Sequence, residues 1–411
     1  MVDIKLLREN PEVFQKGAKD KGVDVDVNHV LEIDTKYREI QTSVQKLREE
    51  RNKFAKDKNI EEGKRIKNEL EIKENALKAV EDELKEWLLK IPNPPGPEAP
   101  KGQGEKDNVE VRKWGEIKKF DFEPKDHLEI GKNLDIIDFE RGAKVAGSGF
   151  YYLKNEGALL EIALVHYGLE FLSKKGFTPV ITPDLARERF YLGTGYMPKG
   201  PEAQTYTVSD SDLGLIATSE VTLAGFHADE VLPEKELPKK YGGYSHCFRV
   251  EGGAYGKYSK GLYRVHQFTK VEIFVYSKPE ESKKIHEEIL SLEEEFWQSI
   301  GIPYRVVEMC TADLGAQAAR KFDLEAWMPG RKDFGEITST SNTTDYQARR
   351  LNIKYRKGNQ THFVHTLNGT LVATSRGPIA ILENYQEKDG SVVVPEVLRR
   401  YTGFSKIENK K

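Results

Sequence analysis

The first part of the chain carries apolar residues at helical spacing along two stretches that are otherwise rich in Glu, Lys and Arg. In the first stretch, which starts near residue 30, the apolar positions are Leu31, Tyr37, Ile40, Val44, Leu47 and Phe54. In the second they are Ile66, Leu70, Leu77, Val80, Leu84, Trp87 and Ile91. The pattern is interrupted at 59–63. It therefore predicts two antiparallel helices over about 30–91, which cover each other's narrow apolar stripe and leave charged faces in water.

A different pattern follows the helical stretches. The segment IPNPPGPEAPKGQGEKDN, which begins at Ile91, is rich in Pro and Gly, and Pro cannot continue a helix, so a linker is predicted over 93–114. Beyond it, helical patterns such as 157–174 alternate with β-rich runs such as 263–276 and 362–366. We therefore expect an N-terminal domain over 1–92 and an α+β domain over 115–411.

Composition narrows the class of protein. With 411 residues the chain is long enough for two domains, and its net charge of -3 means that any basic surface must be local. Cys247 and Cys310 are too few for a disulfide framework or a four-cysteine zinc site. The start has no signal-peptide pattern, and no apolar run is long enough to span a bilayer. These features predict a cytoplasmic protein without a membrane partner.

Charge is distributed unevenly along the predicted hairpin. Between Lys46 and Lys67 nine basic residues stand against five acidic ones, so surplus positive charge lies at the tip. A free-standing basic tip is suited to the phosphates of a nucleic acid. The candidate contacts are Lys46, Arg48, Arg51, Lys53 and Lys56. A dimerising or purely structural coiled coil, with its charges simply in water, is the alternative that composition leaves open.

The run HCFRVEGGAYGKYSKGLYRVHQFTKVEIFVY, at 246–276, predicts a strand, a Gly-rich loop and a second strand. Because strand side chains alternate between faces, Arg249 and Glu251 share a face of the first strand. One face of the second strand carries Arg264, His266, Phe268, Lys270 and Glu272, and the other carries Val265, Val271 and Ile273. The first of these faces favours a charged, planar ligand such as a nucleotide. An exposed sheet face with cross-strand ion pairs fits the pattern equally well.

Longer motifs distinguish these interpretations. The segment FRVE followed by GLYRVHQFTKVE resembles motif 2 of class II aminoacyl-tRNA synthetases in its seryl form. The stretch FYYLKNEGALLEIALVHY through GFTPVITPDL, with Pro183, resembles motif 1, and HTLNGTLVATSRGPIAILENYQ, with Arg376, resembles motif 3. The start DIKLLRENPE and the segment IPNPP extend the resemblance to seryl-tRNA synthetases over nearly the whole chain. The HIGH, KMSKS and P-loop patterns of other nucleotide-binding enzymes do not occur.

The resemblance implies both an activity and an architecture. The activity is the activation of L-serine with ATP and its transfer to the terminal ribose of tRNA(Ser), with tRNA(Sec) as a further candidate acceptor. The architecture is an antiparallel catalytic sheet flanked by helices and preceded by a tRNA-binding coiled-coil arm. A homodimer built around motif 1 is also implied, and two-fold dimers are the commonest oligomers.

The resemblance further implies the residues of an ATP site. Arg249 would contact the α-phosphate and the serine carboxylate, while Arg264 and Arg376 would bind the outer phosphates. Glu336 and Ser339 match the family's Mg²⁺ ligands, which are oxygen donors suited to a hard cation. The full expected set is Arg249, Val250, Glu251, Arg264, Val265, Phe268, Glu336, Ile337, Thr338, Ser339 and Arg376.

Serine selection is implied for three polar segments. Thr218 and Glu272 would bind the amino group, and Glu272 and Thr370 would bind the hydroxyl group that alanine lacks. The full expected set is Thr218, Ser219, Glu220, Arg249, Glu272, Asn368 and Thr370. The expected catalytic residues are Arg249, Glu272 and Arg376. Thr370 taken alone is an ordinary strand residue.

Two further kinds of site are left unassigned. No residue is assigned as a general base, and His266 is at least as readily a structural histidine as a catalytic one. Cys310, His362 and His365 do not have the spacing of zinc ligands, so no zinc is expected.

The chain departs from the family pattern in the loop of motif 2. Where the family commonly has GRDTRG, this chain has GKYSKG at 256–261. Lys257 and Lys260 keep positive charge for the acceptor end of tRNA, but the acidic residue is lost, which affects transfer more than activation. Gly149 stands where a basic residue often precedes the Phe of motif 1, and the arm is shorter than in many bacterial relatives.

Two other functions are compatible with parts of the pattern. A relative that charges a carrier protein would lack the helical arm, which this chain has. A non-enzymatic paralogue would be altered at Arg249, Glu272 or Arg376, and all three are intact. A different class II synthetase is disfavoured because the TSE, KVE and NGT segments jointly match the serine branch.

Overall fold

The computed structural model describes residues 2–56, 60–196, 205–251 and 260–409. The chain divides into two compact units, Met1–Pro94 and Pro95–Lys411. Along the described parts of the chain, no helix is both long and apolar enough to cross a bilayer.

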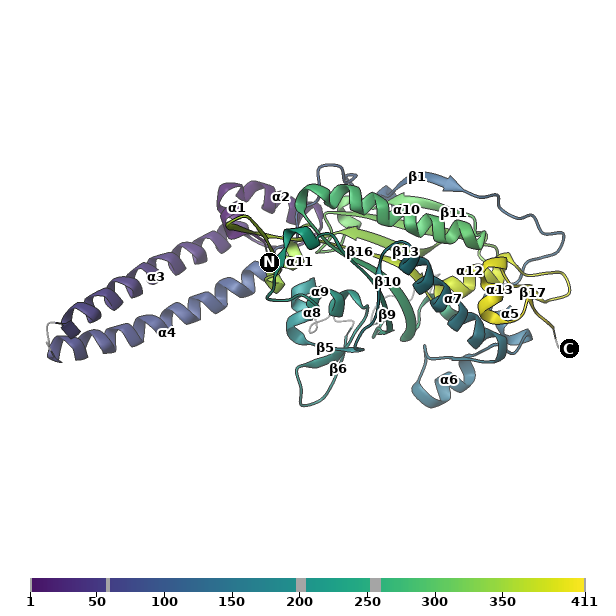
Figure 1. Cartoon of the computed structure of the whole chain (residues 1–411), viewed down its shortest axis with the longest axis horizontal. Coiled ribbons are helices and arrows are strands. Elements are labelled where there is room, and N and C mark those ends of the chain that lie inside the picture. Colours follow the sequence, from purple (N-terminus) through teal and green to yellow (C-terminus); the bar gives the residue numbers. More distant parts are fainter. Residues whose placement is uncertain (1, 57–59, 197–204, 252–259, 410–411) are drawn as a thin grey trace. The chain divides into compact units, whose positions relative to one another are not determined.

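The first unit consists of helices. Two short helices, α1 (Ile4–Glu9) and α2 (Pro11–Asp20), precede the long pair α3 (Val27–Lys56) and α4 (Ile60–Lys90) (Figure 1). The long pair is antiparallel, because Arg48 lies 2.7 Å from Glu74 while the rings of His29 and Trp87 lie 4.7 Å apart. Its buried seam contains Val44, Leu47, Ile66 and Leu70. The predicted helical hairpin is confirmed.

The start of the second long helix differs from the prediction. The expected interruption at 59–63 is wrong over 60–63, since α4 begins at Ile60 and runs through Gly63, and residue 59 lies outside the described residues. Glu61 and Glu62 occupy its first turn, where the helix dipole favours carboxylates. A side chain at Gly63 would meet nothing within 4 Å, so this glycine sits on an open helix surface. The cost of a glycine within a helix, about 1 kcal/mol, is small enough for such a long helix to absorb.

The second unit is built on one large sheet. Among the described residues eight strands form it, and their order is β1 (Val109–Trp114), β11 (Tyr304–Glu308), β12 (Arg320–Met328), β13 (Asp333–Asn342), β16 (His365–Ala373), β10 (Gln267–Ser277), β9 (Lys239–Phe248) and β4 (Thr178–Ile181). Neighbouring strands are antiparallel apart from β4, which pairs in parallel with β9. The predicted α+β architecture is confirmed.

Helices pack against this sheet and share its core. They are α7 (Asn155–Lys174), α10 (Ser282–Ile300) and α12 (Arg376–Asn384) (Figure 1). On β10 the residues Val271, Ile273 and Val275 face this core, and burying each side chain is worth about 1.5–3 kcal/mol. The intervening positions Lys270 and Glu272 point to the opposite face, so the predicted alternation holds on the strand itself.

Smaller elements surround the sheet. The remaining helices are α5 (His127–Asn133), α6 (Phe139–Ala146), α8 (Glu188–Thr194), α9 (Glu220–Gly225), α11 (Tyr346–Leu351) and α13 (Glu396–Thr402). The short strands pair as β2 (Ile137–Asp138) with β3 (Tyr152–Leu153), and as β17 (Val392–Val393) with β18 (Lys406–Ile407). Two three-stranded sheets consist of β5 (Leu185–Arg187), β7 (Leu213–Leu215) and β6 (Tyr206–Thr207), and of β15 (Gln360–Phe363), β14 (Lys354–Lys357) and β8 (Val231–Pro233).

Three predicted boundaries are wrong. The expected linker at 93–114 ends in β1, whose alternating sequence VEVRKW pairs with β11. The expected strand at 263–276 begins only at Gln267, because a 3₁₀ turn at Gly261–Tyr263 precedes it. The run at 362–366 is divided between β15 and β16.

Candidate active site

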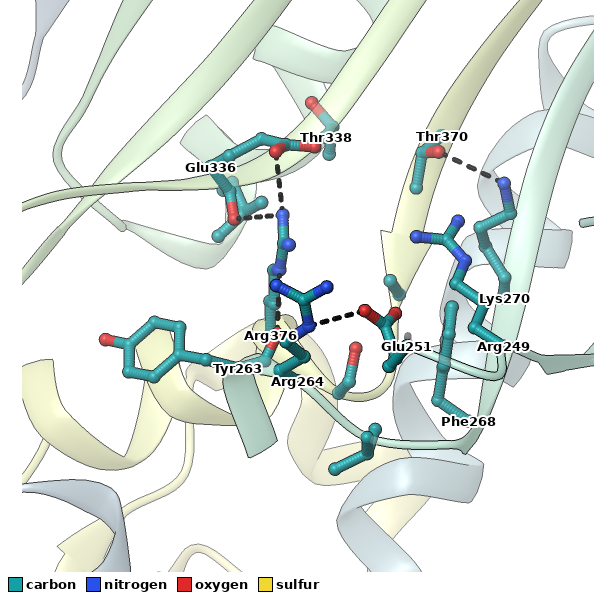
Figure 2. Close-up of a pocket in the computed structure, with 14 residues that line it drawn as sticks. Arg249, Glu251, Tyr263, Arg264, Phe268, Lys270, Glu336, Thr338, Thr370 and Arg376 are labelled. Atoms are coloured by element: carbon teal, nitrogen blue, oxygen red, sulfur yellow. Dashed lines mark hydrogen bonds and ion pairs between the residues drawn. The ribbon is translucent and has the colours of Figure 1, made fainter. Parts of the chain in front are cut away.

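A pocket lies over one face of the main sheet, where β13, β16 and β10 are neighbours (Figure 2). Its walls come from the segments after β9 and before β10, from the three strands, and from the start of α12. The residues that line it are Arg249, Glu251, Tyr263, Arg264, Val265, Phe268, Lys270, Glu336, Ile337, Thr338, Thr370, Ala373, Ser375 and Arg376. Segments far apart in the sequence therefore meet in one place.

Two arginine–carboxylate ion pairs form the charged side of the pocket. Arg264 Nε lies 2.6 Å from Glu251 Oε2, and Arg376 Nη1 lies 2.9 Å from Glu336 Oε2 (Figure 2). The side chains of Arg376 and Glu336 remain 31% and 42% exposed. An anionic ligand can therefore compete with each carboxylate for its guanidinium group, which is suited to bidentate phosphate binding.

Arg249 has a different neighbour. Its guanidinium lies 5.1 Å from the centroid of the Phe268 ring, and its Nε donates to the Ala217 carbonyl at 3.4 Å. Cation–π contact with a ring face does not use the guanidinium N–H groups, so it is compatible with an anion bound to Arg249. The arrangement gives the pocket a third arginine beside an aromatic surface.

Turns, and not strand alternation, direct these arginines. β9 ends at Phe248, so Arg249 and Glu251 do not lie on a strand as predicted. Glu251 has a φ of 51°, in the left-handed region, which turns its side chain toward Arg264. Arg264 itself follows the 3₁₀ turn. The predicted convergence occurs, but its predicted cause is wrong.

His266 lies apart from this pocket, contrary to its predicted place on the shared face. Its backbone carbonyl accepts from the Arg249 N–H at 2.9 Å, and its Nδ1 lies 2.8 Å from the Arg249 carbonyl. Its ring stacks on Phe150 at a centroid distance of 5.2 Å. These contacts give His266 a structural role in holding the segment that carries Arg249.

A β-bulge brings Glu336 and Ser339 to the same side of the sheet. Three positions on a regular strand would put them on opposite faces. Opposite Glu336 and Thr338, however, lie the adjacent residues Glu325 and Leu324, so Ile337 is an extra residue. Ser339 then faces Asp323, and residues that face each other across a ladder point to the same side. Glu336, Ser339 and Asp323 thus form an oxygen-rich edge on one face of the sheet, and of the three Glu336 also lines the pocket.

The ionisation of this edge fits a hard cation. Desolvation opposes the charge on Glu336, yet Arg376 and Lys321 outweigh it and lower the pKa of the carboxyl to about 2. Burial raises the pKa of Asp323 although the charge of Lys321 counteracts it. Among the described residues no group of three or more His, Cys, Asp or Glu side chains could hold a metal alone. Glu336 and Ser339 supply oxygen atoms, which are the kind of donor that hard cations prefer.

Deeper polar contacts lie where β10 and β16 meet the segment before α9. Lys270 forms an ion pair with Glu272, donates to Thr218 Oγ1 at 2.8 Å and lies 3.5 Å from Thr370 Oγ1. Thr218 Oγ1 in turn donates to Glu272 Oε2 at 3.3 Å. The side chains of Lys270 and Glu272 are 6% and 2% exposed. Because the two charges are paired and shielded from water, this cluster keeps a fixed geometry.

Glu220 belongs to a neighbouring network that does not line the pocket. Gln347 and Asn368 donate to its Oε1 at 2.7 and 2.8 Å, and the Tyr196 hydroxyl donates to its Oε2 at 3.1 Å. Burial, followed by the charge of Glu272, raises the pKa of this carboxyl to about 7. Glu220 and Asn368 therefore support the wall of the Thr218 cluster from behind.

Three residues of these networks are not among the site residues predicted from the sequence. Lys270 was assigned to the ligand-facing side of the strand but not to a site, although it belongs to the KVE segment on which the resemblance rests. Gln347 and Asp323 carry no motif signal and are brought in by α11 and β12. Of the expected site residues, Ser219 is buried just before α9, whereas Val250 is not among the pocket-lining residues.

The expected tRNA contacts are spread over both units. Lys46, Arg51, Lys53 and Lys56 are exposed on α3, and Arg48, also exposed, is paired with Glu74. In the other unit, Lys260 lines a surface pocket with Arg331 and Lys332. Lys257 lies outside the described residues.

Comparison with protein families matches both parts of the chain. Residues 206–385 match the tRNA synthetase class II core domain (G, H, P, S and T). Residues 1–95 match the seryl-tRNA synthetase N-terminal domain. The first match contains the pocket and the Thr218 cluster, and the second contains the helical hairpin.

Individual proteins are similar over the whole length. The serine--tRNA ligase of Dictyoglomus turgidum is 53% identical over 425 aligned residues, which cover 100% of both chains. That of Rubrobacter xylanophilus is 52% identical and covers 98% of both chains. The crystal structure of seryl-tRNA synthetase from Pyrococcus horikoshii complexed with ATP superposes with a TM-score of 0.92 at 43% identity, covering 99% of each chain.

Proposed function

Because this chain belongs to the seryl-tRNA synthetase family and ligates serine to tRNA with ATP as a substrate, we propose that its pocket residues divide between the two small substrates. The observation that carries the proposal is the meeting of three arginines with a buried Lys270–Glu272–Thr218 cluster around one pocket. The open arginine side takes ATP, and the closed cluster takes serine.

ATP binds along the face that carries the ion pairs. Phe268 stacks on the adenine, with Glu251 and the backbone near Val250 and Val265 at its edge. Arg264 and Arg376 exchange their carboxylate partners for the outer phosphates. The partial exposure of the Arg376–Glu336 pair supports this exchange, since a solvated ion pair is worth only about 0–1 kcal/mol.

Serine binds beside Thr218, Glu272 and Thr370. Thr218 and Glu272 accept hydrogen bonds from its ammonium group, and Glu272 with Thr370 meets its hydroxyl. The near-complete burial of Thr218 and Glu272 supports discrimination, because alanine would leave polar groups without partners. Ser219, Glu220 and Asn368 hold this wall through the network behind it.

Glu336 and Ser339 are the proposed ligands of Mg²⁺, with Ile337 and Thr338 forming the strand between them. When bound with ATP the ion neutralises charge on the phosphates that leave. The low pKa of the Glu336 carboxyl supports the assignment, because a carboxylate must be ionised to bind a cation.

The reaction then proceeds by positioning. Arg249 bridges the serine carboxylate and the α-phosphate, so that a carboxylate oxygen forms a bond to the α-phosphorus. The bond from this phosphorus to the β-phosphate oxygen breaks, and Arg264 and Arg376 stabilise the charge of the departing pyrophosphate. A terminal ribose hydroxyl of tRNA next attacks the carbonyl carbon of seryl-adenylate and AMP leaves. No covalent intermediate with the enzyme is needed.

Wider assignments follow from the same family. The basic residues of α3, with Lys257 and Lys260, contact tRNA(Ser) and also tRNA(Sec), and the enzyme works in the cytoplasm. It forms a homodimer through motif 1. Ile162 on α7 and Ile181 on the edge strand β4 support the dimer, because these apolar side chains are 63% and 79% exposed.

Pyrophosphate exchange tests the proposal. Labelled pyrophosphate should enter ATP in the presence of serine and much less with threonine or alanine. Charging of tRNA(Ser), measured in parallel, should follow exchange. Exchange without charging would contradict the assigned tRNA contacts, and no exchange with serine would contradict the assigned pocket.

A further inference from the structure

His127 is a buried histidine that does not line the ATP pocket. It is the first residue of α5 and is 2% exposed. Its Nδ1 lies 3.2 Å from Glu383 Oε1, and its Nε2 lies 3.1 Å from the backbone nitrogen of Leu262. A backbone N–H can only donate, so Nε2 accepts this bond and Nδ1 carries the proton toward Glu383. The imidazole thus bridges Glu383 and Leu262 as a donor on one side and an acceptor on the other.

The two partners of His127 belong to the segments that carry the phosphate-binding arginines. Glu383 lies on α12, whose first residue is Arg376. Leu262 lies in the 3₁₀ turn that leads directly into Arg264. The turn also contacts the first residue of α12, because the Tyr263 carbonyl accepts from Arg376 Nε at 3.5 Å (Figure 2). The bridge therefore ties the turn to the helix at a second point.

Both ends of the bridge are fixed by further contacts. Glu383 also accepts from the backbone N–H groups of His127 and Gly330, at 3.0 and 2.9 Å. The Tyr263 ring packs edge-on against the imidazole with centroids 5.3 Å apart. A side chain at Gly261, whose φ is 65°, would come within 2.2 Å of His127 Nε2. The turn is thus fitted closely against the imidazole.

We propose that His127 is a positioning residue for ATP: by linking Glu383 to the backbone of Leu262, it holds Arg264 and Arg376 at the spacing that the phosphates require. It touches neither substrate. The inference rests on the proposed ATP site and adds to it a residue from outside the three motifs.

Two substitutions separate the halves of the bridge. In His127→Asn the amide nitrogen can replace the Nδ1 donor to Glu383, but nothing reaches Leu262. In His127→Gln the longer side chain can place its oxygen near the Nε2 position and accept from Leu262, while the backbone N–H at position 127 still donates to Glu383, so the link is kept. Loss of one buried hydrogen bond should raise the KM for ATP in pyrophosphate exchange about tenfold in His127→Asn. The KM for serine should stay within about twofold, and His127→Gln should recover most of the ATP effect.

A further variant changes the 3₁₀ turn and leaves His127 unaltered. Gly261→Ala adds the methyl group that would collide with Nε2, so it should raise the KM for ATP while leaving His127 in place. Gly358→Ala is its matched control, because Gly358 has a φ of 59° but no atom within 4 Å of the added carbon. The control carries the same backbone strain without the collision and should leave both KM values unchanged.

The outcomes distinguish this inference from the function on which it rests. Absence of serine-dependent exchange in the unaltered enzyme would overturn the proposed ATP site itself. Normal exchange in that enzyme, with an unchanged KM for ATP in His127→Asn, would overturn only the role of His127. That role would also be overturned if both KM values rose together with a loss of thermal stability, or if His127→Gln were no better than His127→Asn.

Discussion

On the proposed ATP side of the site the paired side chains of Arg376 and Glu336 are 31% and 42% exposed, whereas on the proposed serine side those of Lys270 and Glu272 are 6% and 2% exposed. Water weakens the first pair, so its partners can be exchanged for a ligand at little cost. The second pair is shielded, and removing one member would leave a buried charge without compensation. In the proposed site the two halves would therefore bind their substrates in different ways, one by exchange of partners and the other by fixed geometry.

The difference matches what each half has to recognise. Phosphates are highly charged and offer many oxygens, so arginines that reach them from several segments are sufficient. Serine differs from alanine by one hydroxyl group. Buried polar groups can distinguish the two amino acids because they lose a hydrogen-bond partner when alanine is bound. The closed cluster of Lys270, Glu272 and Thr218 provides such groups.

The largest expected effect is on the ATP side. Arg376→Ala should lower kcat/KM for ATP in pyrophosphate exchange about 10³-fold, because a charge that stabilises departing pyrophosphate is lost. Its free energy of unfolding should change by no more than about 1 kcal/mol, since the pair with Glu336 is solvated. Exchange kinetics and urea denaturation measure both quantities. Arg356→Ala, at an exposed position on β14, is the control. A large loss of stability in Arg376→Ala would remove the contrast between the two halves.

The next effect is on the serine side and appears in stability as well as activity. Lys270→Met should lower the free energy of unfolding by about 3–5 kcal/mol, because it leaves Glu272 charged and buried. The KM for serine should rise at the same time. In the double variant Lys270→Met/Glu272→Gln the stability should return while the serine KM stays high. Urea denaturation of the three proteins tests this, and equal stability of the single and double variants would contradict it.

Much of this arrangement could be predicted from the sequence. The motif segments predicted which parts of the chain meet, and strand alternation predicted that Lys270 and Glu272 share a face. The direction of Glu251 could not be predicted, because strand alternation gives no sign of a φ of 51° at this position. The bulge at Ile337 could not be predicted from the sequence either, because the extra residue is recognised only when β13 is aligned with its partner strand β12.

Burial was the property that sequence reasoning could judge least. Lysine is among the residues least often buried, so Lys270 was not assigned to a site, even though its partner Glu272 was. His127 could not be recognised from the sequence either. It precedes all three motifs, and its two partners are brought next to it only by the packing of α12 and the 3₁₀ turn.

A smaller effect concerns the pH dependence of the serine side. Burial, then the charge of Glu272, raises the pKa of the Glu220 carboxyl from 4.5 to about 7. A carboxyl whose pKa is raised in the folded state favours folding fully below its unfolded pKa, and this contribution is lost as the pH rises through the folded value. The free energy of unfolding should therefore fall by about 2 kcal/mol between about pH 5 and pH 8 through this group.

Glu220→Gln is the comparison protein for this measurement. Its amide cannot ionise, so the difference in unfolding free energy between it and the unaltered enzyme should shrink toward low pH and grow toward high pH. Urea denaturation across the pH range gives both curves. Parallel curves would show that Glu220 does not titrate in this window and that the serine side contains no carboxyl of raised pKa at this position.

The smallest effect lies outside both halves, in the helical arm. Lys53 and Lys56 are exposed in the last turn of α3, whereas Arg48 is paired with Glu74 at 2.7 Å. Lys53→Ala/Lys56→Ala should raise the KM for tRNA several-fold and reduce the salt slope of tRNA binding by about 2, because each lysine bound to a phosphate contributes about one to that slope. Arg48→Ala should have a smaller effect on the KM for tRNA and on the salt slope, because its charge is already neutralised.

Pyrophosphate exchange, which needs neither tRNA nor the arm, should be unchanged in both variants. A fall in exchange would mean that the arm affects the pocket, and the contrast between the ATP and serine sides could then not be attributed to the pocket alone.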